Sequence, residues 1–283
     1  MSMKLSLSVR IAEAPCKTKL NVPLGEIVQL AKELGYQAIC MRASAGGVQT
    51  PRAELENMRR QIESAGLTVS MVTADFDVPL NNDDGPNSLR NISPSLDVAE
   101  ALGCDLIRIC LKTQEDLSYL LPAVEQAANR GIRLAHQCHH ASLFERVDDA
   151  LKILESIGHD HFGLTYEPAN LYVCGEDYGL DVIRQFQPYL MNVYLQNHRL
   201  AADGAGTMES WTRGVQRFDH LPIWESGGVD FPKVVDALKA IDYDGFVTIH
   251  QAYGEIMGPR EAAVESARYL RSLGGFTPHG EGR

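Results

Sequence analysis

The stretch FVTIHQAY, residues 246–253, is a short apolar run that ends in polar side chains. Three earlier runs have the same form: RLAHQCHH at 133–140, GLTYEPAN at 163–170 and NVYLQNH at 192–198. Each run predicts a buried strand that is followed at once by His, Gln, Glu or Asn. Four strands with such side chains at their carboxyl ends indicate one convergent site.

The rest of the chain repeats the pattern of a strand followed by a helix. Apolar runs bounded by turn residues predict eight strands, at 4–9, 36–42, 67–73, 106–111, 132–137, 162–166, 191–195 and 245–249. Helical periodicity predicts eight helices, which begin near residues 23, 51, 93, 114, 143, 180, 231 and 259, and several of them end at a Gly.

Alternating units of this size predict an α/β fold, a single-domain (β/α)8 TIM barrel over residues 1–283. The active site of such a barrel lies at the carboxyl ends of its strands. A doubly wound open sheet is the alternative, and it is disfavoured because no Gly-rich phosphate loop follows the first strand. We accordingly expect no nucleotide cofactor.

Two long polar segments interrupt the repeat, at 75–92 and 199–229. Long loops in compact domains are usually functional, so we expect both to cover the active site. The last residues, 274–283, predict a loose tail.

The composition narrows the class of partner. The chain has 26 Lys and Arg against 37 Asp and Glu, a net charge of −11. An acidic surface repels phosphate backbones and anionic membranes, so we expect neither nucleic acid nor a membrane as partner. There is no signal-peptide pattern and no run of 18 apolar residues, which predicts a cytoplasmic protein. The six Cys form no CxxC pair and are interpreted as reduced thiols.

The whole chain resembles the sugar phosphate isomerase/epimerase superfamily of xylose isomerase-like barrels. The likeness rests on GIRLAHQCHH, FGLTYEPANL, NVYLQNHR, WESGGVDF and FVTIHQAY, which occur in the family's order. The resemblance implies proton abstraction from a carbon next to a carbonyl, with stabilisation of the enediolate that forms. It also implies a small carbohydrate substrate, a divalent metal ion and assembly into homo-oligomers.

The chain departs from the family at the metal ligands that the resemblance implies. Those positions fall on Gln137, Glu167, Tyr194 and His250, and a further family Glu falls on Cys40. Only Glu167 keeps a carboxylate.

Two hypotheses follow from this altered set. In the first, Glu167 and His250 bind a divalent metal with the help of Gln137 and either His139 or His198. Such donors suit Zn²⁺, Fe²⁺, Ni²⁺ or Mn²⁺ better than Mg²⁺. In the second, no metal binds, and Glu167 works as an acid/base pair with one of the three histidines.

The function predicted from these features is an isomerase or epimerase acting on a sugar, keto-sugar or polyol. The predicted catalytic residues are Glu167, His139, His198 and His250. The predicted substrate-binding residues are Gln137, Asn170, Tyr194, Arg42 and Arg108. A lyase or dehydratase that uses the same enediolate is one alternative. A catalytically degenerate sugar-binding or regulatory protein is the other.

Overall fold

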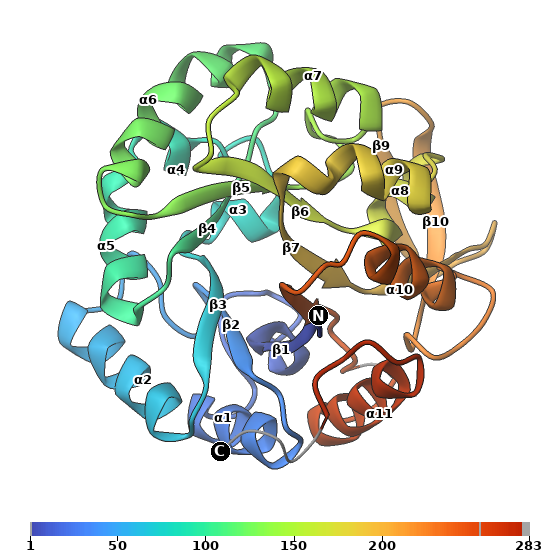
Figure 1. The fold of residues 1–283 in the computed structure, drawn as a ribbon, viewed down its shortest axis with the longest axis horizontal. Helices are drawn as coiled ribbons and strands as arrows, with labels where there is room; N and C mark the ends of the chain where they lie inside the picture. Colours follow the sequence, from blue (N-terminus) through green and yellow to red (C-terminus); the bar gives the residue numbers. More distant parts are fainter. Residues whose placement is uncertain (1, 255, 279–283) are drawn as a thin grey trace.

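The computed structural model describes residues 2–254 and 256–278, and its centre is a closed barrel of eight parallel strands (Figure 1). The order around the barrel is β1-β11-β7-β6-β5-β4-β3-β2. The first and last strands close it, with Lys4 opposite Phe246 and Leu7 opposite Ile249. The predicted single-domain TIM barrel is therefore confirmed.

The barrel strands follow the predicted apolar runs. They are β1 (Lys4–Ser8), β2 (Ala38–Arg42), β3 (Thr68–Thr73), β4 (Leu106–Ile109), β5 (Arg133–Gln137), β6 (Phe162–Tyr166), β7 (Leu190–Leu195) and β11 (Phe246–Ile249). The helices are α1 (Leu24–Glu33), α2 (Arg52–Ser64), α3 (Asp77–Leu80), α4 (Asn87–Arg90), α5 (Ser93–Leu102), α6 (Leu117–Ala128), α7 (Val147–Ile157), α8 (Pro168–Cys174), α9 (Leu180–Phe186), α10 (Phe231–Ala240) and α11 (Pro259–Ser272). Short 3-10 turns are η1 (Val9–Ala12), η2 (Gln114–Asp116) and η3 (Gln187–Tyr189).

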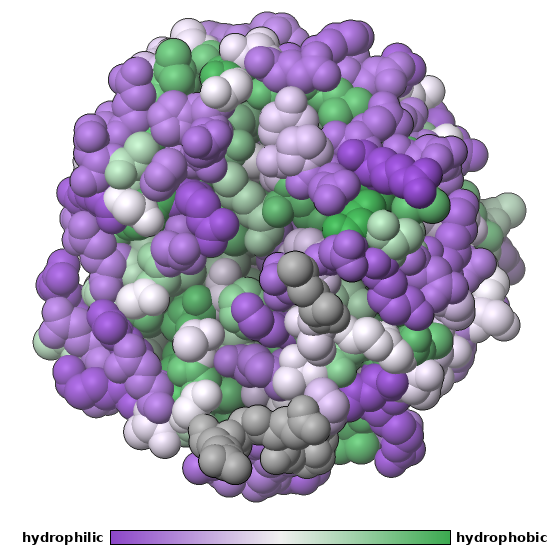
Figure 2. All heavy atoms as spheres, in the orientation of Figure 1, coloured by the Kyte–Doolittle hydropathy of each residue, from purple (hydrophilic) through white to green (hydrophobic). Residues whose placement is uncertain are grey.

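The helices surround the barrel because each carries one apolar face. In α7, Val147, Ala150, Ile153 and Leu154 are buried. The helix ends at Gly158, whose left-handed backbone (φ 53°) is conformationally inexpensive for a residue without a Cβ. Figure 2 shows mainly hydrophilic side chains over the outer helices on the visible face, with hydrophobic ones nearer the centre.

The interior of the barrel is polar. Ser6 Oγ lies 2.7 Å from Ser70 Oγ, and Thr248 Oγ1 donates to Asn192 Oδ1 at 3.2 Å. Side chains along a strand alternate between the inside and the outside of the barrel, so the inward position after Asn192 on β7 is Tyr194. The same spacing on the other strands places polar groups at the carboxyl end of the barrel.

The predicted loop at 199–229 contains ordered sheet, which corrects the sequence interpretation. Strands β8 (Asn197–Leu200), β9 (Gly206–Ser210) and β10 (Gly214–Leu221) form a separate antiparallel sheet in the order β8-β10-β9. β9 and β10 lie outside the barrel, next to α8 and α9 in Figure 1. Their alternation was missed because only two of the eight residues of β10 are buried, and several of the others are charged or polar.

Three smaller differences concern predicted loops. The segment 75–92 contains the short helices α3 and α4, and α8 follows β6 directly. The described part of the predicted loose tail pairs with Met3, the residue just before β1. There Met3 N donates to Gly275 O at 2.8 Å, Thr277 N donates to Met3 O at 3.0 Å, and Phe276 is buried. The remaining tail residues, 279–283, lie outside the described residues.

No helix within the described parts of the chain combines the length and the apolarity that crossing a bilayer requires.

Candidate active site

Glu167 lies at the carboxyl end of β6 and is fully buried. Two side-chain amides hold its carboxylate: Gln196 Nε2 donates to Oε1, and Asn170 Nδ2 donates to Oε2 at 2.7 Å. Asn170 stands one turn into α8, and its amide also donates to Cys138 O at 3.0 Å. The orientation of the carboxylate is therefore fixed by neighbouring elements.

The environment of Glu167 makes its proton available near neutral pH. Burial raises the pKa of Glu167 to about 7. The positive charges of Arg10 and Arg108 and the two amide hydrogen bonds oppose this rise. A carboxyl group with such a pKa can both take up and release a proton at physiological pH.

His250 follows β11 and is also fully buried. Its Nε2 lies 3.3 Å from Arg42 Nη1, and its Nδ1 lies 3.2 Å from Ser8 Oγ. A guanidinium can only donate, so Nε2 must accept from Arg42, and Nδ1 must carry the ring proton and donate to Ser8. Burial, followed by the charges of Arg10 and Arg42, holds the pKa of His250 well below its usual range. The imidazole is therefore neutral.

Arg42 connects His250 to a buried carboxylate. Its Nε donates to Glu13 Oε1 at 2.7 Å, and Ser44 Oγ donates to the same oxygen at 2.6 Å. The side chains of Arg42 and Glu13 are 0% and 2% exposed, so this ion pair is shielded from solvent. Such a pair fixes the position of Arg42.

The predicted residue Tyr194 stacks on the imidazole of His250, with ring centroids 3.7 Å apart. Its hydroxyl lies 3.2 Å from Cys40 Sγ. The position of the family's ligand His and the position of its further Glu are therefore a phenol and a thiol here, and the two side chains contact each other.

These residues do not fit a divalent metal ion. The lone pair of His250 Nε2 is occupied by Arg42, whose positive charge repels a cation. Both carboxylate oxygens of Glu167 accept hydrogen bonds from amides. No group of three His, Cys, Asp or Glu residues suited to a metal ion occurs within 2–254 and 256–278. A metal site commonly needs three or four such ligands.

The other predicted residues lie around this centre. Gln137 and Arg108 are buried, on β5 and β4, and Gln137 Oε1 and Arg108 Nε have no hydrogen-bond partner among the described residues. His198 on β8 is 1% exposed, and its ring lies 4.9 Å from that of His220, centroid to centroid. Neither of its ring nitrogens meets a hydrogen-bond partner within the described chain. Burial holds the pKa of His198 well below the usual value.

His139 lies further out than the other three predicted catalytic residues. It is half-buried, its Nδ1 lies 2.9 Å from His140 O, and its ring packs on that of His140 at 4.3 Å. Burial, followed by the neighbouring His140, lowers its pKa well below the usual value. The structure therefore brings Glu167 and Asn170 into direct contact, joins Arg42, Tyr194 and His250 in a second group, and places His139 apart from both.

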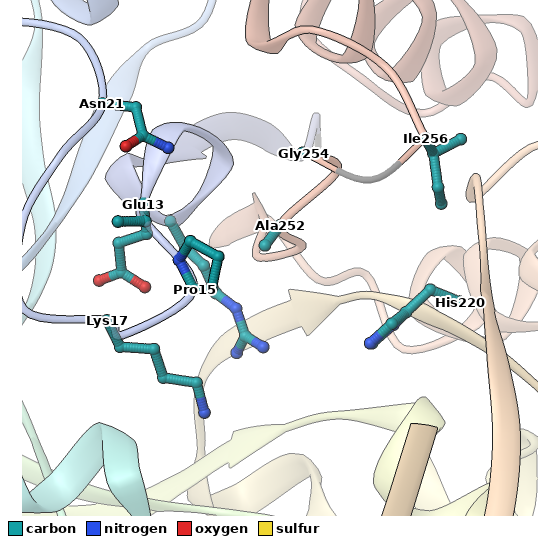
Figure 3. A pocket seen from close by; sticks show the side chains of 10 residues that line it. Glu13, Pro15, Lys17, Asn21, His220, Ala252, Gly254 and Ile256 are labelled. Atoms are coloured by element: carbon teal, nitrogen blue, oxygen red, sulfur yellow. The ribbon is translucent and has the colours of Figure 1, made fainter. Parts of the chain in front are cut away.

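A cavity of about 280 Å³ opens near the carboxyl end of β1, and we call it the mouth cavity. Its lining includes Arg10, Lys17, Asn21 and His220. Figure 3 shows Lys17 and His220 pointing into the same space from opposite sides. Glu167 is not among the residues of the described chain that line it. Arg10 connects the two regions, because it lines the cavity and its charge acts on Glu167.

Sequence reasoning missed four residues of this region. Arg10 and Lys17 follow the first strand, and Glu13 is recognisable only through its contact with Arg42. Gln196 directly follows β7, two residues after Tyr194, so strand alternation already placed the two on the same face. The quoted run NVYLQNH contained this signal.

Comparison with known proteins agrees with the fold. A family model described as "Xylose isomerase-like TIM barrel" matches residues 28–273. No curated protein shows significant sequence similarity to the chain.

Three solved structures illustrate the similarity. The probable 3-DHS dehydratase AsbF of Bacillus anthracis is 17% identical with a TM-score of 0.74, and the alignment covers 95% of this chain and 99% of that one. A xylose isomerase-like TIM barrel protein of Mycobacterium smegmatis, in complex with magnesium, is 15% identical with a TM-score of 0.67 and 96% coverage of both chains. D-allulose 3-epimerase of Methylomonas sp., in complex with D-allulose, is 14% identical with a TM-score of 0.65, covering 96% of this chain and 97% of that one. At these identities the similarity shows the fold alone.

Proposed function

Because this chain belongs to the xylose isomerase-like TIM barrel family, we propose that it is an isomerase or epimerase of a sugar, keto-sugar or related polyol. The observation that carries the proposal is the buried carboxylate of Glu167, which two amides orient and whose pKa burial raises to about 7. Enzymes that abstract a proton next to a carbonyl need a base of this kind.

In the proposed reaction, Glu167 takes the proton from the carbon next to the carbonyl. The electrons of that C–H bond form a carbon–carbon double bond, and the carbonyl oxygen becomes negatively charged. Return of the proton to the neighbouring carbon, with transfer of the hydroxyl proton to the former carbonyl oxygen, gives the isomer. Return of the proton to the opposite face of the same carbon restores the carbonyl and gives the epimer. Glu167 can return the proton for isomerisation. Epimerisation needs a second acid on the opposite face, and His198, which is neutral because burial holds its pKa well below the usual value, serves only after it has taken up a proton.

The developing negative charge needs an electrophile, and we assign this role to Arg108. Its guanidinium is buried on β4, its Nε lacks a partner in the described chain, and its charge already acts on Glu167. A fixed cation in a site with little water stabilises an oxyanion strongly. The neutral His250, held by Arg42 and Ser8, positions the aromatic ring of Tyr194 at the floor of the site.

Access to Glu167 requires movement in this proposal. Glu167 has no exposed surface and does not line the mouth cavity, whereas Arg10, whose charge acts on Glu167, does line it. The substrate therefore enters through the mouth cavity and displaces side chains there before reaction. Closure of the same side chains excludes water during the reaction.

The test is exchange of substrate hydrogen with solvent. A panel of aldoses, ketoses, polyols and sugar acids is incubated in D₂O with wild type, Glu167→Gln and Glu125→Gln, and followed by proton NMR. Glu125 is an exposed residue of α6 and serves as the matched control. We expect deuterium incorporation next to a carbonyl with wild type and Glu125→Gln, and its loss, by a factor of about 100 or more, with Glu167→Gln.

Other outcomes separate the alternatives. Formation of an unsaturated product with loss of water identifies a dehydratase that uses the same base. Exchange that persists in Glu167→Gln overturns the role of Glu167. Binding of a panel member without exchange in wild type indicates the degenerate sugar-binding protein.

A further inference from the structure

Four cationic side chains gather at the carboxyl end of the barrel, in a protein whose net charge is −11. They are Arg10, Lys17, Arg42 and Arg108, and their charges oppose one another. Arg42 and Arg108 act to lower the pKa of Arg10, which burial, the larger cause, brings to about 10. Burial, followed by the same three arginines, lowers the pKa of Lys17 to about 8. Crowded cations of this kind are unfavourable unless an anion offsets them.

The carboxylates nearby do not balance this charge. The negative charge of Glu13 is already offset by its ion pair with Arg42. Glu167, with a pKa of about 7, is charged only part of the time at neutral pH. The charges of Arg10, Lys17 and Arg108 therefore exceed the anionic charge available to them.

In each of three guanidinium groups, one buried nitrogen also lacks an acceptor. Arg10 Nε, Arg42 Nη2 and Arg108 Nε are buried and have no hydrogen-bond partner among the described residues. Arg42 and Arg108 are 0% and 3% exposed. Buried donors are usually satisfied, so unpaired charged donors point to a ligand that supplies the acceptor oxygens.

The mouth cavity gives such a ligand a place. Lys17 points into it (Figure 3), from a tight turn in which Lys17 N donates to Ala14 O at 2.9 Å. The left-handed backbone of Lys17 (φ 59°) is uncommon for a residue with a side chain, and this turn imposes it. Arg10, which also lines the cavity, extends the positive charge inward to Glu167.

We propose that Arg10 and Lys17 bind an anionic group of the substrate, a carboxylate or a phosphate, in the mouth cavity. The proposal rests on the isomerase or epimerase function above and narrows its substrate class to sugar acids, keto acids or sugar phosphates. A guanidinium and an ammonium match the oxygens of either anion. The anion held at the mouth places the reacting carbon of the same molecule toward Glu167.

The experiment compares matched anionic and neutral probes by calorimetry and thermal shift at neutral pH. D-gluconate is set against D-glucitol, and D-glucose 6-phosphate against D-glucose, with oxalate and inorganic phosphate as the anionic groups alone. The variants are Arg10→Gln, Lys17→Gln and Lys17→Arg, with Lys19→Gln as control because Lys19 is exposed in the same loop. Circular dichroism checks that each variant is folded.

We expect wild type to bind at least one anionic probe more tightly than its neutral partner. The matched pair with the larger difference in affinity then shows whether the site takes a carboxylate or a phosphate. Lys17→Gln and Arg10→Gln should each weaken this binding roughly tenfold or more, Lys17→Arg should restore it, and Lys19→Gln should leave it unchanged. Equal binding of anionic and neutral partners, or equal affinities in Lys17→Gln and Lys19→Gln, overturns the proposal.

Glu167→Gln separates this proposal from the proposed function. It should keep the preference for the anion while losing hydrogen exchange. Retained exchange in Glu167→Gln contradicts the function and leaves the anion site standing. Lost exchange together with no preference for anions contradicts the site alone.

Discussion

Glu167→Gln is expected to make the protein more stable than wild type at alkaline pH, although it removes the proposed base. In wild type, ionisation of Glu167 places a charge in a fully buried site. Gln has the same shape without the charge. Gln196 Oε1 has no partner among the described residues, so rotation of that amide lets it accept from the new side chain while the 2.7 Å bond from Asn170 is kept.

The magnitude follows from the two pKa values. In the unfolded chain a Glu has its usual pKa of 4.5, and in the folded protein the pKa of Glu167 is about 7. Because the folded-state value is raised, the stability contributed by the protonated carboxyl is fully present below pH 4.5. It is lost as pH rises through 7. At about 1.4 kcal/mol per pKa unit, the loss in free energy of unfolding is about 3 kcal/mol.

The assay is urea denaturation of wild type, Glu167→Gln and Glu125→Gln at about pH 5 and about pH 8.5. The free energies of unfolding of Glu167→Gln and wild type should differ little at the lower pH. At the higher pH the variant should be more stable by about 3 kcal/mol. Glu125→Gln should follow wild type at both. If Glu167→Gln is equal to or less stable than wild type at about pH 8.5, the reasoning about the buried charge is wrong.

Two further perturbations test the surroundings of the site. Glu13→Gln leaves the buried Arg42 without its carboxylate and should cost about 3–5 kcal/mol in urea denaturation. By contrast, Arg52→Gln, which breaks an exposed i,i+4 pair, should cost under about 1 kcal/mol, and equal losses would refute the distinction. Glu145→Gln should speed amide hydrogen exchange in β9 and β10 without affecting the barrel strands, because Glu145 accepts from backbone amides in the turn between them at 2.9 Å. Burial acts to raise the pKa of Glu145, but hydrogen bonds from those amides lower the pKa overall. The stability that the carboxylate gives to the β9–β10 hairpin is therefore present above the usual Glu pKa and is lost as pH falls. Protection of the hairpin amides that does not change in acid would contradict this.

The barrel could be predicted because its signals are local. Each strand is a short apolar run, and several helices end at a residue such as Gly103 or Gly158, both with left-handed backbones. The sheet β8-β10-β9 could not be predicted in the same way. Only 5 of its 17 residues are buried, so most of its residues contact solvent and do not form the apolar run that marks a barrel strand.

The candidate site was partly predictable for a related reason. A Glu at the end of an apolar strand is seldom buried without a purpose, and this singled out Glu167. The role of His250 depended on contacts that the sequence does not display. Arg42 approaches it from β2, 208 residues away along the chain, and occupies the nitrogen that a metal would need.

Arg10 was missed because it lies in the turn η1 after the first strand, where no apolar run or strand alternation singles it out. The positive charge at the mouth arises from residues on η1, β2 and β4 and in the loop after η1, which only the closed barrel brings together. Net charge, the property available from composition, has the opposite sign.

The central claim is that Glu167 is a base with a pKa near neutrality in a site built without a metal ion. It is tested most directly by NMR of protein labelled with ¹³C at the Glu carboxyl carbons, treated with a chelator and titrated with and without equimolar Zn²⁺ or Mn²⁺. The account predicts one carboxyl resonance that titrates with a pKa of about 7, is absent in Glu167→Gln, shifts to higher pKa in Arg108→Gln, and is unchanged by either metal. Titration of every Glu carboxyl near its usual pKa, or stoichiometric metal binding that displaces the proton of Glu167, would contradict it.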